Sequence, residues 1–139
     1  MNILVTGANG FLGVEVIKAL THLDVKHIRC LVRPGSNLNG LDELDVEIVR
    51  GSLNSEDNVK TSLEGIDTVV HLAASKSGSP MGMFTETVVS TEILFDCIEA
   101  MLIKKFVFVS SFSLYGTSLL SNGQTVDEQT PIEPNPELR

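Results

Sequence analysis

Short apolar runs alternate with longer segments of helical periodicity along most of this chain. Continuous apolar runs bounded by turn residues are typical of strands in a sheet that is covered on both faces. The pattern predicts strands at residues 3–5, 27–32, 45–49, 68–73 and 106–109. It predicts helices at residues 11–20, 55–63 and about 83–101. After Gly116 the periodicity disappears into polar and proline residues, so we expect a loop-like tail there.

Strands that alternate with helices indicate an α/β fold with a parallel sheet. If the crossovers are right-handed, five strands give a doubly wound sheet in the order 3-2-1-4-5. We predict one nucleotide-binding domain at residues 1–118, followed by the tail at 119–139. Local signals support the helix at 55–63, because Ser55 can cap its start and Gly65 can end it.

The composition is that of a globular protein, with 139 residues, 42% hydrophobic and 20% charged. The formal net charge of −8 argues against nucleic acid or an anionic membrane as a partner, because both need clustered positive charge. Cys30 and Cys97 lie in apolar segments, and we interpret them as core residues rather than a disulfide. No apolar run has the length of a membrane span, and no leader pattern precedes the first strand, so we expect a cytoplasmic protein.

The first strand runs directly into a G-x-x-G-x-x-G pattern made by Gly7, Gly10 and Gly13. A glycine turn at the start of a helix exposes backbone N–H groups, and the helix dipole adds positive charge to them. The strand and helix on either side are the context that gives such a pattern meaning. We therefore expect the turn, including Asn9, Phe11 and Leu12, to hold the diphosphate of a dinucleotide.

The second strand ends in Val32-Arg33, with no carboxylate nearby in the sequence. An acidic residue at this place bonds the ribose hydroxyls of NAD, whereas an arginine suits the 2′-phosphate of NADP. We predict that Arg33 contacts that phosphate and that the cofactor is NADP, with NAD possible. The alternative is a solvated arginine at a strand end.

Three further groups of polar residues have simpler interpretations. Ser111 follows the fifth strand, where its hydroxyl could hydrogen-bond a substrate oxygen or satisfy loop backbone. His71 interrupts an apolar strand and fits a hydrogen-bonded core histidine better than a metal ligand, and we predict no metal site. An acidic cluster follows the second strand, and we interpret it as a solvated face. It consists of Asp42, Glu43, Asp45 and Glu47.

Taken together, four segments resemble the extended short-chain dehydrogenase/reductase superfamily, the NAD(P)-dependent epimerase/dehydratase group. They are Thr6–Gly13, Val69–Ala74, Phe106–Gly116 and the tail with Asp127-Glu128, Pro131 and Pro134. The resemblance covers essentially the whole chain. It implies a Rossmann fold that binds a dinucleotide and, in the intact enzyme, a small-molecule substrate.

The resemblance also assigns roles to single residues. It implies that Ser111 hydrogen-bonds the reacting oxygen as a catalytic residue. Thr87 stands where the family often has asparagine, and Ser52 stands where it commonly has an aspartate that contacts adenine. The remaining positions that it places at the cofactor are Leu53, Leu72, Ala73, Ala74 and Val109.

In members of this family, the tyrosine of a Tyr-x-x-x-Lys pair is the general acid/base, and the lysine lowers its pKa and holds the nicotinamide ribose. This chain cannot build the pair. Tyr115 is the single tyrosine, Leu119 stands four residues later, and no lysine follows Lys105. We therefore expect a chain truncated before the sixth strand, the inactive cofactor-binding portion of an epimerase, dehydratase or reductase. The alternative is a non-catalytic NADP(H)-binding sensor or interaction module. An uncovered fifth strand at the sheet edge would favour self-association.

Overall fold

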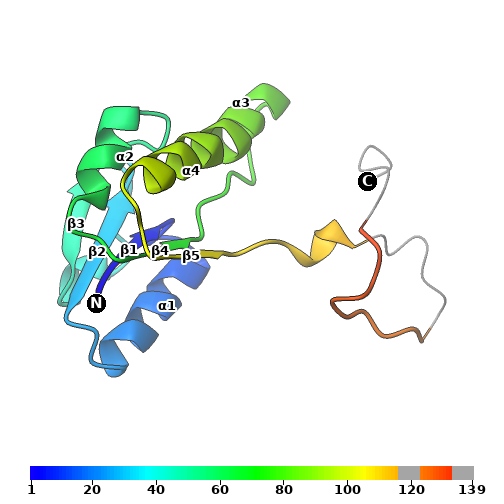
Figure 1. The fold of residues 1–139 in the computed structure, drawn as a ribbon, viewed down its shortest axis with the longest axis horizontal. Coiled ribbons are helices and arrows are strands. Elements are labelled where there is room, and N and C mark those ends of the chain that lie inside the picture. The colour runs from blue at the N-terminus through cyan, green and yellow to red at the C-terminus, as the bar shows by residue number, and fades with distance from the viewer. Residues whose placement is uncertain (116–122, 133–139) are drawn as a thin grey trace. The chain divides into compact units, whose positions relative to one another are not determined.

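The computed structural model describes residues 1–115 and 123–132. The chain forms two compact units, Met1–Phe108 and Val109–Arg139. The first unit holds a five-stranded parallel sheet in the order β3-β2-β1-β4-β5 (Figure 1). Its strands are β1 Asn2–Thr6, β2 His27–Val32, β3 Glu47–Arg50, β4 Thr68–His71 and β5 Lys105–Phe108. The predicted doubly wound Rossmann fold and its strand order are confirmed.

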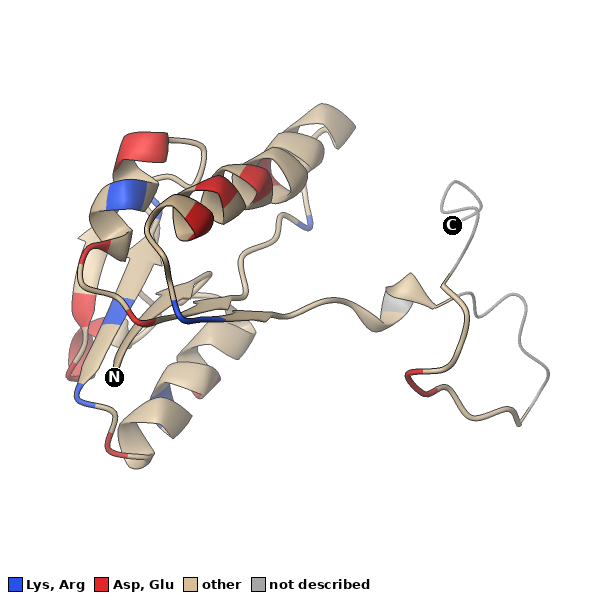
Figure 2. Ribbon diagram, viewed as in Figure 1, with Lys and Arg blue, Asp and Glu red and all other residues tan. Residues whose placement is uncertain are grey.

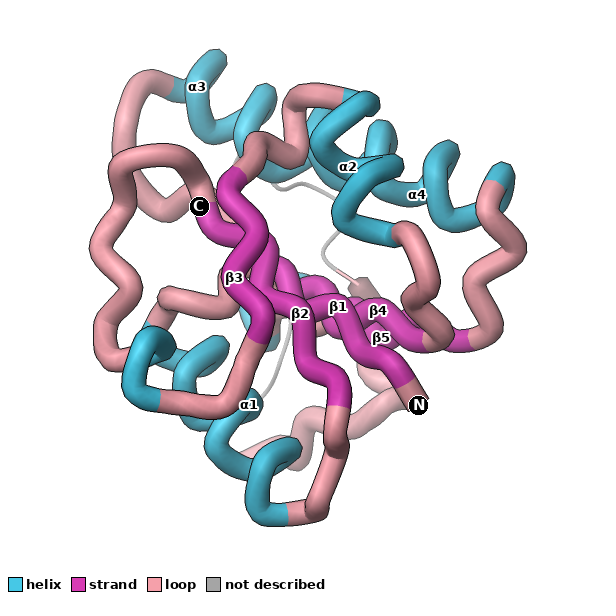
Figure 3. The backbone as a smooth tube through the Cα atoms, turned by 90° about the vertical axis from the view of Figure 1, so that its left-hand side faces the viewer, coloured by secondary structure: helices cyan, strands magenta, loops and turns pink. Residues whose placement is uncertain are grey.

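The helices cover both faces of this sheet, with α1 on one side and α2 and α4 on the other (Figure 3). The α-helices are α1 Phe11–His22, α2 Glu56–Leu63, α3 Pro80–Phe84 and α4 Ser90–Ala100. A π-helical segment, η2 Thr85–Val89, joins α3 to α4, and η1 Leu41–Glu43 and η3 Phe112–Leu114 are short 3-10 turns.

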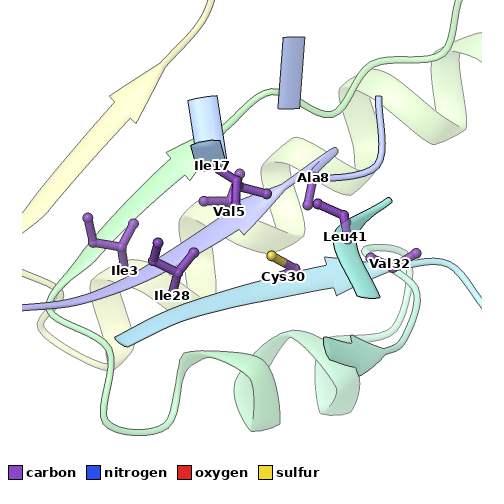
Figure 4. Close-up of a cluster of buried hydrophobic side chains, with 8 residues drawn as sticks. All are labelled: Ile3, Val5, Ala8, Ile17, Ile28, Cys30, Val32 and Leu41. Atoms are coloured by element: carbon purple, nitrogen blue, oxygen red, sulfur yellow. The ribbon is translucent and has the colours of Figure 1, made fainter. Parts of the chain in front are cut away.

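Alternate side chains of the strands enter two separate cores, which explains why the strands are continuously apolar. Ile3 and Val5 of β1 pack toward α1, together with Cys30 of β2 (Figure 4). Leu4 packs on the opposite face, in the cluster that also contains Cys97 of α4. Both cysteines are therefore buried core residues with free thiols, as predicted.

Most predicted boundaries hold within a few residues, and the exceptions have local causes. β4 ends at His71 rather than residue 73, although the Leu72 N–H still bonds the Thr6 carbonyl oxygen at 3.1 Å. The helical segment predicted from about residue 83 begins at Pro80, because the Ser79 side chain caps it. The predicted cap of α2 is confirmed, since the Ser55 hydroxyl oxygen accepts from the Asn58 N–H.

The second unit contains little regular structure among its described residues. The Phe112 and Tyr115 rings meet edge to face with centroids 5.7 Å apart, and Tyr115 forms an antiparallel bridge with Ile132. Residues 116–122 and 133–139 lie outside the described part, and so does our division of the chain after residue 118. That division stays a prediction.

Acidic residues of the first unit include a series along α4 (Figure 2). The predicted solvated acidic cluster of Asp42, Glu43, Asp45 and Glu47 is exposed. Glu47 also pairs with Arg29 at 2.8 Å on the neighbouring strand. None of the helices in the described ranges is both long and apolar enough to cross a membrane.

Candidate dinucleotide-binding site

The turn between β1 and α1 passes close to the carboxyl end of β4, and this closeness requires glycine. Gly7 has φ +67°, and a Cβ there would lie 2.7 Å from the Ala73 nitrogen and 2.8 Å from the Leu72 carbonyl carbon. No side chain fits at that distance, and the left-handed backbone is easy only for glycine. Gly7 therefore lets the turn lie directly against the end of β4.

Gly13, the third glycine of the pattern, lets the first turn of α1 pack closely against the backbone of Gly7 and Ala8. A Cβ on Gly13 would lie 2.3 Å from the Gly7 carbonyl oxygen and 2.4 Å from the Ala8 carbonyl oxygen. The Gly10 N–H donates to the Gly7 oxygen at 3.0 Å, which closes the turn. Gly7, Gly10 and Gly13 are thus brought together, and two of them exclude a side chain.

Within the described residues, the N-cap residue of α1 offers no side chain to the first N–H groups of the helix. Gly10 occupies the N-cap position with extended backbone and makes no capping hydrogen bond through a side chain. The first N–H groups of a helix have no partner within the helix, and they carry the positive end of its dipole. Phe11 and Leu12 of this first turn have exposed side chains. The turn therefore offers a set of main-chain donors to an anion.

Asn9 uses its side chain to hold a neighbouring loop. Its Nδ2 donates to the Asn37 carbonyl oxygen at 2.7 Å, and Asn39 Nδ2 donates to the Asn9 carbonyl oxygen at 2.6 Å. The loop after β2 is thereby fastened to the glycine turn. Any contact of Asn9 with a cofactor would come from its backbone, or would require its side chain to leave Asn37.

A partly buried series of hydrogen bonds connects β1 and β4 to η2 and α4. Thr6 Oγ1 lies 2.6 Å from His71 Nδ1, and His71 Nε2 lies 3.0 Å from Thr91 Oγ1. The Thr91 hydroxyl donates to the Thr87 carbonyl oxygen. Thr87 Oγ1 in turn accepts from the Ser75 N–H at 3.0 Å.

The donors in this series of hydrogen bonds determine which ring nitrogen of His71 carries the proton. The single hydroxyl proton of Thr91 goes to Thr87, so Thr91 accepts from a protonated Nε2. Nδ1 is then the acceptor, and Thr6 donates to it. Burial lowers the pKa of His71 from 6.5 to about 4, which keeps the ring neutral near pH 7. The predicted hydrogen-bonded core histidine is confirmed.

Arg33 meets an acidic partner that is remote in the sequence. Its Nη1 lies 3.6 Å from a carboxylate oxygen of Glu86, which belongs to η2. The Arg33 side chain is 69% exposed, so it can also reach other groups. No carboxylate lies near Arg33 in the sequence, but in the structure Glu86 lies beside it. Sequence reasoning missed Glu86, because no local pattern connects residues that lie so far apart.

The residues after β3 form a small hydrogen-bonded turn. The Ser52 N–H donates to Asn58 Oδ1 at 2.9 Å, and Ser52 Oγ accepts from the Asn54 N–H at 3.2 Å. Leu53 packs against the core on the α2 side. The Ser52 side chain therefore already has a backbone partner in the turn.

The remaining predicted residues fall in both units. Leu72 and Ala73 are half-buried beside Gly7, and Ala74 is exposed. Val109 and Ser111 are exposed in the second unit, where the Ser111 carbonyl oxygen accepts from the Leu114 N–H. The structure thus brings together the glycines and the end of β4. It does not relate Val109 and Ser111 to them.

This arrangement agrees with what comparison of the chain with known proteins finds. Residues 3–137 match the NAD dependent epimerase/dehydratase family. The chain belongs to that family. Among curated relatives, it is 31% identical over 137 residues to sterol demethylase protein B of Methylococcus capsulatus, covering 96% of this chain.

Solved structures of similar proteins have the same fold. The crystal structure of gox2253 is 31% identical, with a TM-score of 0.85 over 95% of this chain. A short-chain dehydrogenase/reductase superfamily protein from Agrobacterium tumefaciens, solved with bound NAD, is 32% identical with a TM-score of 0.79 over 97% of this chain. The chain spans 42% of the curated relative and 40% of each of these structures.

Proposed function

We propose that this chain is the dinucleotide-binding portion of an NAD(P)-dependent epimerase, dehydratase or reductase. The glycine turn is the observation that carries the proposal. Gly7 and Gly13 leave no room for a side chain, and the first turn of α1 lacks a side-chain cap. This is the surface that a diphosphate needs, because main-chain N–H groups can approach it without obstruction. The dinucleotide fits the residues present.

The residues beside this turn have roles that follow from their positions, whereas the role of Ser111 rests on the family resemblance alone. Backbone N–H groups of Phe11 to Gly13 would bind the diphosphate, and Leu72 and Ala73 would border the adenosine and its ribose. Arg33 would contact the 2′-phosphate, which makes NADP(H) the proposed cofactor. Ser111 is proposed to hydrogen-bond the reacting oxygen of the substrate in the intact enzyme.

In the intact enzyme the cofactor would supply or accept a hydride at a carbinol or carbonyl carbon. A nucleotide sugar or a related carbonyl compound is the proposed substrate class. Tyr115 pairs with Ile132 in a backbone bridge, and no lysine stands four residues after it. In enzymes that use a tyrosine-lysine pair, the lysine makes the tyrosine an effective base at neutral pH, and this chain has no lysine at that position. We therefore propose that the 139-residue chain alone binds the cofactor but has negligible turnover.

Calorimetric titration of the 139-residue chain with NADPH and with NADH tests this function. We expect binding of at least one coenzyme, and a loss of at least about thirtyfold in Gly13→Ala, because the new Cβ would displace the turn. Gly82→Ala is the matched control, since the nearest atom to its Cβ would be a side-chain oxygen 3.1 Å away. The absence of binding by the natural chain at millimolar coenzyme would refute the proposal.

Two further proposals concern the surroundings of the chain. A cytoplasmic location is consistent with a cofactor that cells hold in that compartment. Self-association through β5 is proposed because this strand lies at the sheet edge with exposed apolar side chains.

A further inference from the structure

Glu86 connects the loops that follow two different strands. One carboxylate oxygen, Oε2, lies 3.6 Å from Arg33 Nη1, directly after β2. The other, Oε1, accepts a hydrogen bond of 2.9 Å from Asn54 Nδ2, in the turn after β3. Both loops lie at the carboxyl edge of the sheet, where open α/β sheets hold their ligands. The structure thus puts a carboxylate of η2 beside Arg33, although the sequence directly after β2 has no carboxylate.

The Asn54 amide supports the view that this corner is an incomplete polar site. A carboxylate only accepts hydrogen bonds, so Glu86 orients the Asn54 amide with its nitrogen toward the carboxylate. Asn54 Oδ1 is then buried, with no partner in the described part of the chain. Buried acceptors without partners are rare in folded proteins and call for an explanation.

The charges at this corner act against each other when a phosphate approaches. Arg33 attracts a phosphate, while Glu86 both holds Arg33 and repels a second negative group. The Arg33 side chain is 69% exposed and the Glu86 side chain 38%, so solvent weakens the pair and Arg33 can leave it. The adenosine ribose of NADH carries only hydroxyls, and a carboxylate can accept hydrogen bonds from them.

We infer that Glu86 is the residue that sets the preference between NADPH and NADH, by competing with the 2′-phosphate for Arg33. This inference rests on the proposed function, since it concerns the same dinucleotide. If it is correct, the natural chain prefers NADPH over NADH only slightly. The selectivity then depends on the contact between Arg33, directly after β2, and Glu86 of η2, rather than on Arg33 alone.

The substitution Glu86→Gln tests the inference, because glutamine keeps the shape and can still accept from Asn54. We expect the Kd of NADPH to fall about 5- to 20-fold, as a like charge is removed and Arg33 is released. The Kd of NADH should change less than about twofold. The NADPH gain should shrink in 0.5 M salt, because salt screens exposed charges. Glu99→Gln, which removes an equal charge from an exposed site on α4, should change neither affinity.

A second pair of variants isolates the contact with Arg33. In an Arg33→Ala background, Glu86→Gln should improve NADPH binding by less than about threefold, since no arginine is left to release. An equal gain in both backgrounds would overturn the inference, and so would an unchanged ratio of the two Kd values in Glu86→Gln. Circular dichroism checks that each variant is folded. If neither coenzyme binds the natural chain or any variant, the proposed function itself has failed, which is a different result.

Discussion

Thr6 Oγ1 lies 2.6 Å from Nδ1 of His71, and both residues are completely or nearly completely buried. They are the last residues of β1 and β4, two neighbouring strands whose ends border the glycine turn. Because Thr91 accepts from the other ring nitrogen, Thr6 is the donor to Nδ1. The hydrogen bond therefore joins the two strands at the place where the dinucleotide is proposed to bind.

Thr6→Val should destabilise the chain by about 1–3 kcal/mol. Valine keeps the β-branched shape but leaves His71 Nδ1 buried without a donor. Urea denaturation followed by circular dichroism measures the change in the free energy of unfolding. Thr21→Val is the control, because it removes a hydroxyl that donates to the Ile17 carbonyl oxygen at an exposed position of α1, and it should change this free energy by less than about 0.5 kcal/mol. Equal effects of the two substitutions would show that the Thr6 bond contributes nothing specific.

The low pKa of His71 predicts a pH dependence of stability. The unfolded chain binds a proton at this histidine near pH 6.5, whereas the folded chain binds it only near pH 4 because the ring is buried. Acidification from pH 6.5 to 4 therefore favours unfolding, and the full loss is on the order of 3 kcal/mol. Stability from this group is fully present above pH 6.5.

Proton NMR titration of the His71 ring and urea unfolding between pH 7 and 4.5 check this expectation. The His71→Asn variant should lose this part of the pH dependence. A His71 ring that titrates near pH 6.5 in the folded chain would contradict the burial argument.

The sequence was sufficient for the fold because its signals are local. β2 matches the predicted 27–32, since Pro34 and Gly35 stop the apolar run, and Ser55 caps α2 as expected. The predicted fourth strand was too long, because Leu72 continues the apolar run and still bonds β1. The π-helical segment Thr85–Val89 was not foreseen, because one extra residue per turn leaves little trace in an apolar pattern.

The candidate site was predictable only where one continuous segment forms it. The glycine turn is such a segment, and its steric demands match the prediction. The contacts of Arg33 with Glu86 and of Thr6 with His71 join residues 53 and 65 positions apart, respectively. Such pairs depend on the sheet order and on the side-chain directions, which a single sequence does not contain.

The burial of both cysteines predicts unreactive thiols. Burial, with a smaller effect of Glu47, raises the pKa of Cys30 to about 12, and burial raises the pKa of Cys97. At pH 8 only about one Cys30 thiol in ten thousand is then ionised. We expect Ellman's reagent to modify neither cysteine of the folded chain within an hour, and both after unfolding in urea. A Ser77→Cys variant provides an exposed thiol that should react within minutes. Rapid modification of the natural folded chain would show that a core opens readily.

The edge strand β5 predicts self-association of the chain. In the sheet, β5 pairs with β4 on one side, and Val107 is 48% exposed. Multi-angle light scattering should give masses above 15.0 kDa that rise with concentration. Val107→Lys should weaken association at least about tenfold, because a charge on an edge strand opposes pairing with another edge. Val88→Lys changes an equally exposed valine (49%) on η2 and should have little effect if the edge is the contact. Dissociation by Val88→Lys alone would place the contact on the helices, and a monomer at every concentration would exclude self-association altogether.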